Sequence, residues 1–262
     1  TAARLQAALP RRAGGPWLRA WQLAEQHAAR VLDAPAPQLW EGAVAHTVAR
    51  HLPPHALVHL GSGMPVRDFD GCSGSYPAGV RVLSSRGVNG IDGAASTAAG
   101  LWEAAAASAA ARGERPPVLV ALIGDLTALH DVAGLRLLAG RRVVLVVVDN
   151  GGGGIFEFLP IAQHARAFER HFLTPQPDDL LAVARALGLD VAEATDASAL
   201  GAALAVALES PRPTVLRVPV DRRANVDTHR ARWAEVGRAL EAALSPTDIE
   251  ETRHEHHLVQ GA

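Results

Sequence analysis

Two stretches decide the fold: Pro117–Thr127 (PVLVALIGDLT) and Arg142–Gly154 (RVVLVVVDNGGGG). Each is an apolar run of strand length that ends in glycine together with a carboxylate or a carboxamide. Val143–Val148 is continuously apolar and, apart from Leu145, β-branched, which is typical of a central parallel strand covered on both faces. The two stretches therefore predict buried strands whose carboxyl ends carry polar residues.

Outward from these stretches, short apolar runs alternate with longer Ala- and Leu-rich segments. This alternation is typical of βα units, and it predicts an α/β fold: a three-layer α/β/α doubly wound sheet of about six mainly parallel strands. We expect residues 17–244 to form this domain, residues 1–16 to be the remnant of a middle domain or a linker, and residues 245–262 to be a polar tail. The expected strands are Ala56–Leu60, Val80–Ser84, Pro117–Ile123, Arg142–Val148, Asp190–Ala194 and Thr214–Val218. The expected helices are 1–30 with a break at 14–16, Leu39–His51, Ala94–Ala111, Ala128–Ala139, Asp178–Leu187, Ala197–Leu208 and Thr228–Leu244.

Composition excludes several classes of function. A formal net charge of -2 gives no basic field that would attract nucleic acid or an anionic membrane, so neither is an expected partner. No apolar run approaches the roughly 18 residues that span a bilayer. The single cysteine, Cys72, forbids an intrachain disulfide and fits a cytoplasmic location. All 25 basic residues are Arg, so a P-loop lysine and Schiff-base chemistry are also excluded.

The ends of the two deciding strands carry a candidate metal site. Asp125 and Asn150 each follow an apolar run, and the carboxyl ends of neighbouring parallel strands meet at one sheet edge. Carboxylate, amide and carbonyl oxygens are the ligands that Mg²⁺ prefers, with phosphate oxygens completing its shell. The glycines at 151–154 would let the backbone approach a phosphate closely, and the helix expected after Thr127 would aim its first N–H groups at the same anion.

Structural interpretations compete with this one. A strand that ends in Gly-Asp is often only a turn and a helix cap. Gly61-x-Gly63 suggests a dinucleotide-binding loop, but Val66 stands where that pattern needs a third glycine. Asp92 is expected to cap the following helix, and His130-Asp131 is expected to be structural. The combination of Gly124-Asp125, 24 intervening residues and Asn150 favours the phosphate interpretation.

This combination resembles the signature of thiamin diphosphate (ThDP) enzymes. The resemblance implies that Asp125, Asn150 and the carbonyl of Gly152 hold Mg²⁺, with Mn²⁺ as a possible substitute, and that the ion bridges to the cofactor's diphosphate. Further stretches resemble one branch, the 2-succinyl-5-enolpyruvyl-6-hydroxy-3-cyclohexene-1-carboxylate (SEPHCHC) synthases or MenD family, over roughly Leu39–Arg230. These stretches are Met64–Asp68, Ser85–Gly93, Gly124–Asp131, Gly152–Pro160, Asp221-Arg222, Asn225-Val226 and His229-Arg230.

The family's reaction defines further expectations. Its members decarboxylate 2-oxoglutarate on ThDP and add the resulting succinyl carbanion equivalent to isochorismate in menaquinone biosynthesis. The resemblance implies that Arg67 and Arg86 bind the substrate carboxylates, that Ile91 supports the bent cofactor and that Gly90 offers its carbonyl to the aminopyrimidine. The other expected cofactor contacts are Gly124, Thr127, Gly153, Ile155 and Phe156.

The resemblance also implies partners that this chain does not itself supply. In the family the cofactor lies between two subunits, and the amino-terminal pyrimidine-binding domain of the other subunit carries the activating glutamate. We therefore expect a homodimer or homotetramer, and a chain that is inactive alone. Gly61-Ser62-Gly63 departs from the family's usual Gly-Asn-Ser. Two alternatives remain open: another ThDP-dependent decarboxylase or synthase, and a non-catalytic assembly module.

Overall fold

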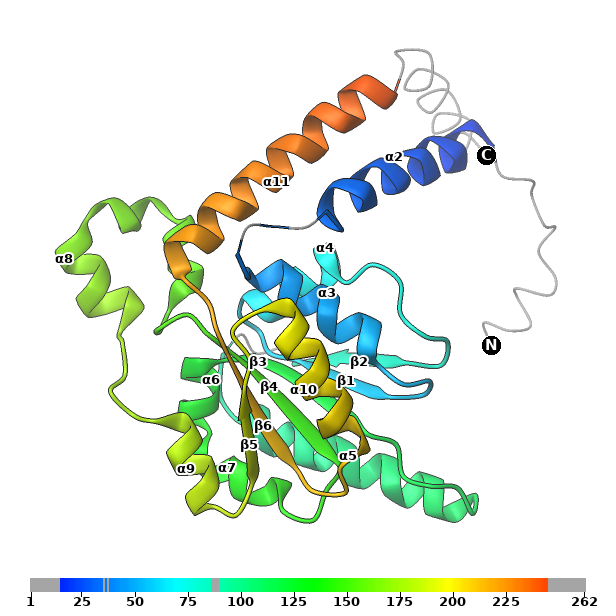
Figure 1. Cartoon of the computed structure of the whole chain (residues 1–262), viewed down its shortest axis with the longest axis vertical. Coiled ribbons are helices and arrows are strands. Elements are labelled where there is room, and N and C mark those ends of the chain that lie inside the picture. Colours follow the sequence, from blue (N-terminus) through cyan, green and yellow to red (C-terminus); the bar gives the residue numbers. More distant parts are fainter. Residues whose placement is uncertain (1–14, 35, 37, 86–89, 245–262) are drawn as a thin grey trace, which may run out of the picture. The chain divides into compact units, whose positions relative to one another are not determined.

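The computed structural model describes residues 15–34, 36, 38–85 and 90–244 (Figure 1). The chain divides into two compact units, one formed by Thr1–Ala34 with Arg230–Ala262 and the other by Pro35–His229. The expected boundary segments 1–16 and 245–262 lie almost wholly outside the described residues. No helix among the described residues combines the length and the hydrophobicity that a membrane crossing requires.

The first unit contains the helix α2 (Pro16–Leu32) and the later part of α11 (Arg222–Ala243). The α2 helix begins with Pro16 in its first turn, where a missing N–H costs nothing. The guanidinium of Arg232 on α11 donates to the carbonyls of Val31 and Ala34 at the end of α2, at 3.0 and 2.8 Å.

The second unit is built on a six-stranded sheet in the order β2-β1-β3-β4-β6-β5, and every pairing is parallel. The sheet and its flanking helices confirm the predicted α/β architecture (Figure 1). The strands are β1 (Leu57–Leu60), β2 (Arg81–Ser84), β3 (Leu119–Gly124), β4 (Val143–Asp149), β5 (Asp190–Glu193) and β6 (Thr214–Pro219). The central pair, β3 and β4, is buried along almost its whole length, as the continuous apolar runs indicated.

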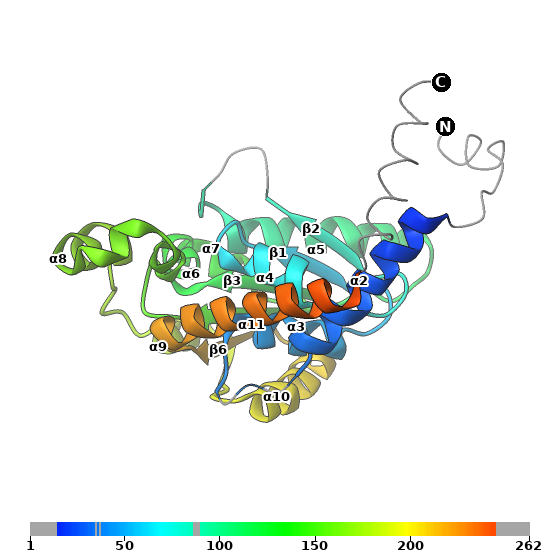
Figure 2. The same cartoon turned by 90° about the horizontal axis from the view of Figure 1, so that it is seen from above.

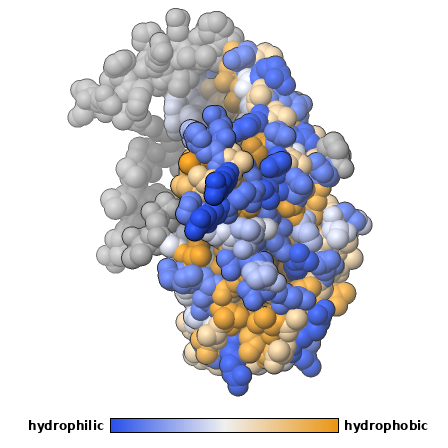
Figure 3. Space-filling model, turned by 90° about the vertical axis from the view of Figure 1, so that its left-hand side faces the viewer, coloured by the Kyte–Doolittle hydropathy of each residue, from blue (hydrophilic) through white to orange (hydrophobic). Residues whose placement is uncertain are grey.

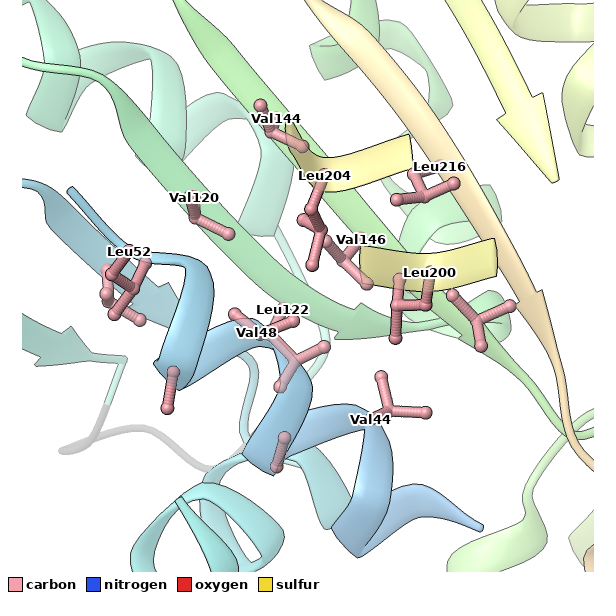
Figure 4. Packing of buried hydrophobic residues seen from close by; sticks show 14 of the residues in the cluster. Val44, Val48, Leu52, Val120, Leu122, Val144, Val146, Leu200, Leu204 and Leu216 are labelled. Carbon is pink, nitrogen blue, oxygen red and sulfur yellow. The ribbon is translucent and has the colours of Figure 1, made fainter. Parts of the chain in front are cut away.

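Helices cover both faces of this sheet (Figure 2). One face is covered by α3 (Glu41–His51), α4 (Met64–Cys72) and α10 (Ala197–Glu209), and the other by α5 (Ala94–Ala111), α6 (Asp125–His130), α7 (Val132–Leu135) and α9 (Leu180–Ala186). Alternate residues of β4 enter the two cores because successive strand side chains point to opposite faces. Val144, Val146 and Val148 pack on the α3 and α10 side (Figure 4), whereas Val143, Leu145 and Val147 pack on the α5 side.

Two helix predictions were wrong in their bounds, and one helix was not predicted. The expected helix Ala128–Ala139 is divided into α6, α7 and the 3₁₀ turn Arg136–Leu138. The division falls at Asp131, whose carboxylate accepts from the backbone N–H and the hydroxyl of Ser96 on α5. Asp131, and not Asp92, therefore caps the first turn of α5, where Asp92 makes no capping hydrogen bond. The α11 helix begins at Arg222, six residues before the expected start, and α4 is a helix that was not among those expected.

Four short helical elements lie between β4 and α9 in the sequence. They are the 3₁₀ helices Gly154–Phe158 and Pro160–Gln163, the helix α8 (Ala165–Phe168) and a π-helix at Glu169–Leu173. Apolar residues gather toward the lower end of the side shown in Figure 3, while hydrophilic residues cover much of the rest.

His59 in the middle of β1 is buried, with 1% of its surface exposed. Burial disfavours the charged imidazolium and lowers the pKa of His59 from 6.5 to about 4. Its Nε2 lies 3.1 Å from the hydroxyl of Ser85, just beyond β2, and the Ser85 carbonyl accepts from the Ser62 hydroxyl at 2.7 Å. A neutral histidine thus links the ends of β1 and β2.

Replacing His59 by Leu, a side chain of similar size, should remove a pH dependence of stability. The unfolded chain protonates His59 below about pH 6.5, but the folded chain does so only near pH 4. The wild type should therefore lose about 3 kcal/mol of unfolding free energy relative to His59→Leu between pH 6.5 and 4. Urea denaturation of both proteins at several pH values measures this difference, and parallel pH profiles would contradict it.

Candidate diphosphate and metal site

A cavity of about 200 Å³ opens at the carboxyl ends of β3 and β4. It collects most of the predicted site residues from segments far apart in the sequence. These are Ile91, Gly124, Asp125, Thr127, Asn150, Gly152, Gly153, Ile155 and Phe156, joined by Glu41, Gly63, Met64, Pro65, Leu126, Val148 and Gly154. A second hollow of about 530 Å³ shares Ile91 and Leu126 with it and is lined otherwise by α6, α7, α9 and the segment before α9.

Strand register brings Asp125 and Asn150 to this cavity. Gly124 of β3 pairs with Val148 of β4, so the two strands end at the same level of the sheet. Asp125 opens α6, and its Oδ1 accepts from the backbone N–H of Leu126 at 2.8 Å. The predicted convergence of the two strand ends is thus present.

The Asp125 carboxylate is poorly compensated. Burial is the main reason that its pKa rises from 3.8 to about 7, and the nearby Asp149 raises it further. The backbone N–H of Gly152 opposes this rise, which places the glycine loop against the carboxylate. Asp149 has its own cation, because Arg217 Nε lies 2.5 Å from its Oδ2. A bound cation would supply the missing charge at Asp125.

The amide of Asn150 is held from two sides. Its Oδ1 accepts from the backbone N–H of Gly154 at 3.3 Å, and its Nδ2 donates to Oε1 of Glu41 at 2.7 Å. A backbone N–H can only donate, so the atom that faces Gly154 must be the amide oxygen. The two contacts therefore agree on a single orientation of the amide.

The glycine loop packs against the π-helix Glu169–Leu173. A Cβ added at Gly152 or Gly153 would lie 2.2 Å from the carbonyl oxygen of Leu173 or Phe172, respectively. The N–H of Gly153 donates to the Leu173 carbonyl at 2.7 Å. These glycines are therefore required by packing against the protein's own backbone, a reason that adds to the expected approach of a phosphate.

Arg222 fastens both sides of this contact. Its Nε lies 2.7 Å from Glu157, just after the glycine loop, and its other nitrogen, Nη2, lies 2.5 Å from Glu169 at the start of the π-helix. Each of these side chains is at least partly buried, so solvent screens the pairs less than it would at an open surface.

Comparison with known proteins identifies this arrangement. A family model described as the C-terminal TPP-binding domain of thiamine pyrophosphate enzymes matches residues 81–218, which is more than half of the chain. The chain belongs to the thiamine pyrophosphate enzymes. The matched segment includes Ile91, Asp125 and Asn150, so the TPP-binding domain supplies most of the cavity.

Two curated relatives of this thiamine pyrophosphate enzyme carry the same name. The protein of Rubrobacter xylanophilus is 41% identical over 225 residues, which cover 84% of this chain and 37% of the relative. That of Myxococcus xanthus is 39% identical over 234 residues, which cover 86% of this chain and 38% of the relative. Both are named 2-succinyl-5-enolpyruvyl-6-hydroxy-3-cyclohexene-1-carboxylate synthase, which confirms the predicted family resemblance. The chain thus spans well under half the length of these relatives.

A solved structure supports the fold of this TPP-binding domain. Benzoylformate decarboxylase from Polynucleobacter necessarius matches with a TM-score of 0.56 and 22% sequence identity. The match covers 71% of this chain and 34% of the decarboxylase chain. At this identity the likeness speaks for a shared fold and not for a shared substrate.

Two of the expected site residues that the structure describes, Arg67 and Gly90, do not line the cavity. Arg67 is exposed on α4, and its Nη1 donates to the carbonyls of Ser62 and Gly63 at 3.1 and 2.6 Å, beside a separate hollow that reaches Ser84. Gly90 is exposed and is not among the described residues on the cavity wall. Arg86 lies outside the described residues. Their roles toward substrate and cofactor stay predictions.

Sequence reasoning missed a buried polar cluster behind Asn150, formed by Glu41, Asp68 and His229. Their ligand-type atoms all lie within 4.8 Å of one another. Burial and then the charge of Asp68 raise the pKa of Glu41 from 4.5 to about 8. Two members stood in quoted stretches, Asp68 at the end of Met64–Asp68 and His229 at the start of His229-Arg230. Glu41 gave only a weaker signal, an acidic residue at the start of an apolar helix.

Two glycine substitutions should separate backbone strain from packing in the loop. Gly151 has φ +79° with open space around it, so Gly151→Ala should cost about 1 kcal/mol from strain. At Gly153 a methyl group meets the Phe172 carbonyl, so Gly153→Ala should cost about 3 kcal/mol or more. Urea denaturation measures both losses. Equal losses would show that the π-helix contact does not constrain the loop.

Proposed function

We propose that this chain binds the diphosphate of thiamin diphosphate and a divalent cation in the β3–β4 cavity, as the cofactor-binding part of a SEPHCHC synthase. The observation that carries the proposal is the convergence of Asp125, Asn150 and Gly152 on one cavity within a TPP-binding domain. The names of the curated relatives support the choice of reaction.

The donor set fits Mg²⁺ or Mn²⁺. Asp125 offers a carboxylate, Asn150 an amide oxygen and Gly152 a carbonyl, all of them hard oxygen ligands. Burial raises the pKa of Asp125 to about 7, and a divalent ion would supply the positive charge that favours its ionised form. Among the described residues that line the cavity there is no Arg, and the sequence contains no Lys, so a metal ion is the natural counter-charge for a diphosphate.

Thiamin diphosphate, when bound, supplies the electron sink for decarboxylating a 2-oxo acid. The chain's own residues bind and orient the cofactor and the substrates. Ile91, Ile155 and Phe156 offer apolar surface that excludes water from the cavity. We assign Arg67 and Arg86 to the carboxylates of 2-oxoglutarate and isochorismate, because a guanidinium can grip a carboxylate with two parallel hydrogen bonds. The Gly90 carbonyl is assigned to the aminopyrimidine of the cofactor.

The proposal includes an assembly. A cavity of about 200 Å³ is small for a whole cofactor of drug-like size, for which pockets of about 300–1,000 Å³ are usual. We assign the remaining contacts to the pyrimidine-binding domain of another subunit, in a cytoplasmic homodimer or homotetramer.

Replacing Asp125 or Asn150 by Ala should weaken ThDP binding in the presence of Mg²⁺ by at least about tenfold, because each change removes a cation ligand. Calorimetric titration of the chain with ThDP, with and without Mg²⁺, measures this loss. Asp70→Ala on the exposed side of α4 is the matched control and should bind as the wild type does. Wild-type affinity that is independent of Mg²⁺ would end the metal-bridge assignment.

A chimera tests the substrate assignment. This chain should be able to replace the matching segment of the Rubrobacter xylanophilus relative, since the two are 41% identical over 225 residues. The chimera is expected to consume 2-oxoglutarate with isochorismate and to leave pyruvate unused, as followed by CO₂ release. The 262-residue chain alone is the control and should show no turnover. A chimera that prefers pyruvate would favour a different ThDP-dependent enzyme.

A further inference from the structure

Glu41 is the one carboxylate on the cavity wall, among the described residues, to which neither the sequence nor the proposed function gave a role. It is the first residue of α3, and only 3% of its surface is exposed. Its Oε1 accepts from Nδ2 of Asn150 at 2.7 Å, while its Oε2 has no hydrogen-bond partner among the described residues. A buried acid in this place needs a reason.

Residues around Glu41 hold it in position. Its backbone N–H donates to Oδ1 of Asn225 at 2.9 Å, in a buried contact between α3 and α11. A carboxylate oxygen of Asp68 on α4 lies within 4.8 Å of one of the Glu41 oxygens, and Nε2 of His229 lies 3.1 Å from Oδ1 of Asp68. The ring of His229 packs edge-on against Trp40, the residue before Glu41, with ring centroids 4.7 Å apart. The side chain therefore sits on a rigid support formed by three helices.

The orientation of Asn150 depends on this support. If the amide flipped, its NH₂ group would face the N–H of Gly154, and its oxygen would face Oε1 of Glu41. Donor would then meet donor at Gly154. At Glu41 acceptor would meet acceptor, because a proton on Glu41 is shared with Asp68 and leaves Oε1 as an acceptor, so both contacts would be lost together. Of the two contacts, the one to Gly154 is long, at 3.3 Å, and the one to Glu41 is short, at 2.7 Å. Glu41 thus makes the stronger contribution to the choice of orientation.

We propose that Glu41 is a positioning residue for the cation, which acts by accepting from the Asn150 NH₂ group so that the amide oxygen, and not the nitrogen, is available as a metal ligand. The proposal rests on the proposed metal site. A flipped Asn150 would offer N–H groups to a cation, and these cannot serve as ligands. Partners of metal ligands act in this way at many protein sites, where their loss typically lowers metal affinity by about 10–100-fold.

Two variants of Glu41 test the assignment. Glu41→Gln keeps an oxygen that accepts from Asn150 and places an NH₂ group toward Asp68, whereas Glu41→Met keeps the length of the side chain but has no comparable acceptor. The Mg²⁺ concentration that gives half-maximal ThDP binding, measured by calorimetry, should rise at least about tenfold in Glu41→Met. In Glu41→Gln it should stay within about threefold of wild type. Glu103→Met, an exposed substitution on α5, is the matched control.

A second background shows whether Glu41 acts through the amide. In Asn150→Asp the two carboxylate oxygens are equivalent, so no orientation has to be selected. Adding Glu41→Met to Asn150→Asp should therefore cause no further rise in the Mg²⁺ requirement. An equal rise in both backgrounds would mean that the two changes are additive, and it would overturn the proposal.

The outcomes separate this inference from the proposed function. If the wild type shows no Mg²⁺-dependent ThDP binding, the proposed metal site fails. If the wild type depends on Mg²⁺ but Glu41→Met resembles it, or Glu41→Gln is as impaired as Glu41→Met, only the role of Glu41 fails. Should Glu41→Met not fold, the side-chain amide protons of Asn150 in the wild type give the answer by NMR. When Mg²⁺ and ThDP are bound, these protons should stay protected from exchange with the solvent. Rapid exchange would overturn the assignment.

Discussion

The parallel pairing of β3 with β4 is the constraint on which the rest of the site depends. Because Gly124 lies opposite Val148, the two strands end at the same level of the sheet, and Asp125 and Asn150 line one cavity. A slip of one residue in either strand would turn every side chain to the opposite face and would exchange the two cores. The apolar packing on both sides of the sheet therefore fixes the position of the polar groups at its edge.

Much of this architecture could be predicted from the sequence, for local reasons. Continuous β-branched runs such as Val143–Val148 are compatible with few structures other than a strand buried on both faces. The glycine and polar residues that follow each run mark where the strand ends. Strand positions, the parallel sheet and the convergence of Asp125 with Asn150 all follow from such signals, because they depend on neighbours in the sequence and on the general geometry of α/β folds.

The remainder depends on contacts between distant residues. The break at Asp131 coincides with the hydrogen bonds of its carboxylate to Ser96, 35 positions earlier, and no local pattern reports that contact. The partner of Asn150 is Glu41, 109 positions away, on a helix in which no functional residue was expected. The resemblance implied a substrate role for Arg67, and that role stays a prediction. In the structure its guanidinium donates to the carbonyls of Ser62 and Gly63, a geometry that the resemblance did not specify.

The packing of the glycine loop against the π-helix limits how the Asn150 motif can be transferred to another protein. The carbonyls of Phe172 and Leu173 occupy the space that side chains at Gly153 and Gly152 would need, and Arg222 joins the segments on both sides of that contact. The conformation of the short signature around Asn150 therefore depends on a second segment, Phe172-Leu173, which follows about twenty residues later. If the signature alone were grafted onto another sheet, the glycine loop would lack the π-helix against which it packs. A transferable unit must therefore extend at least from β4 to the beginning of α11.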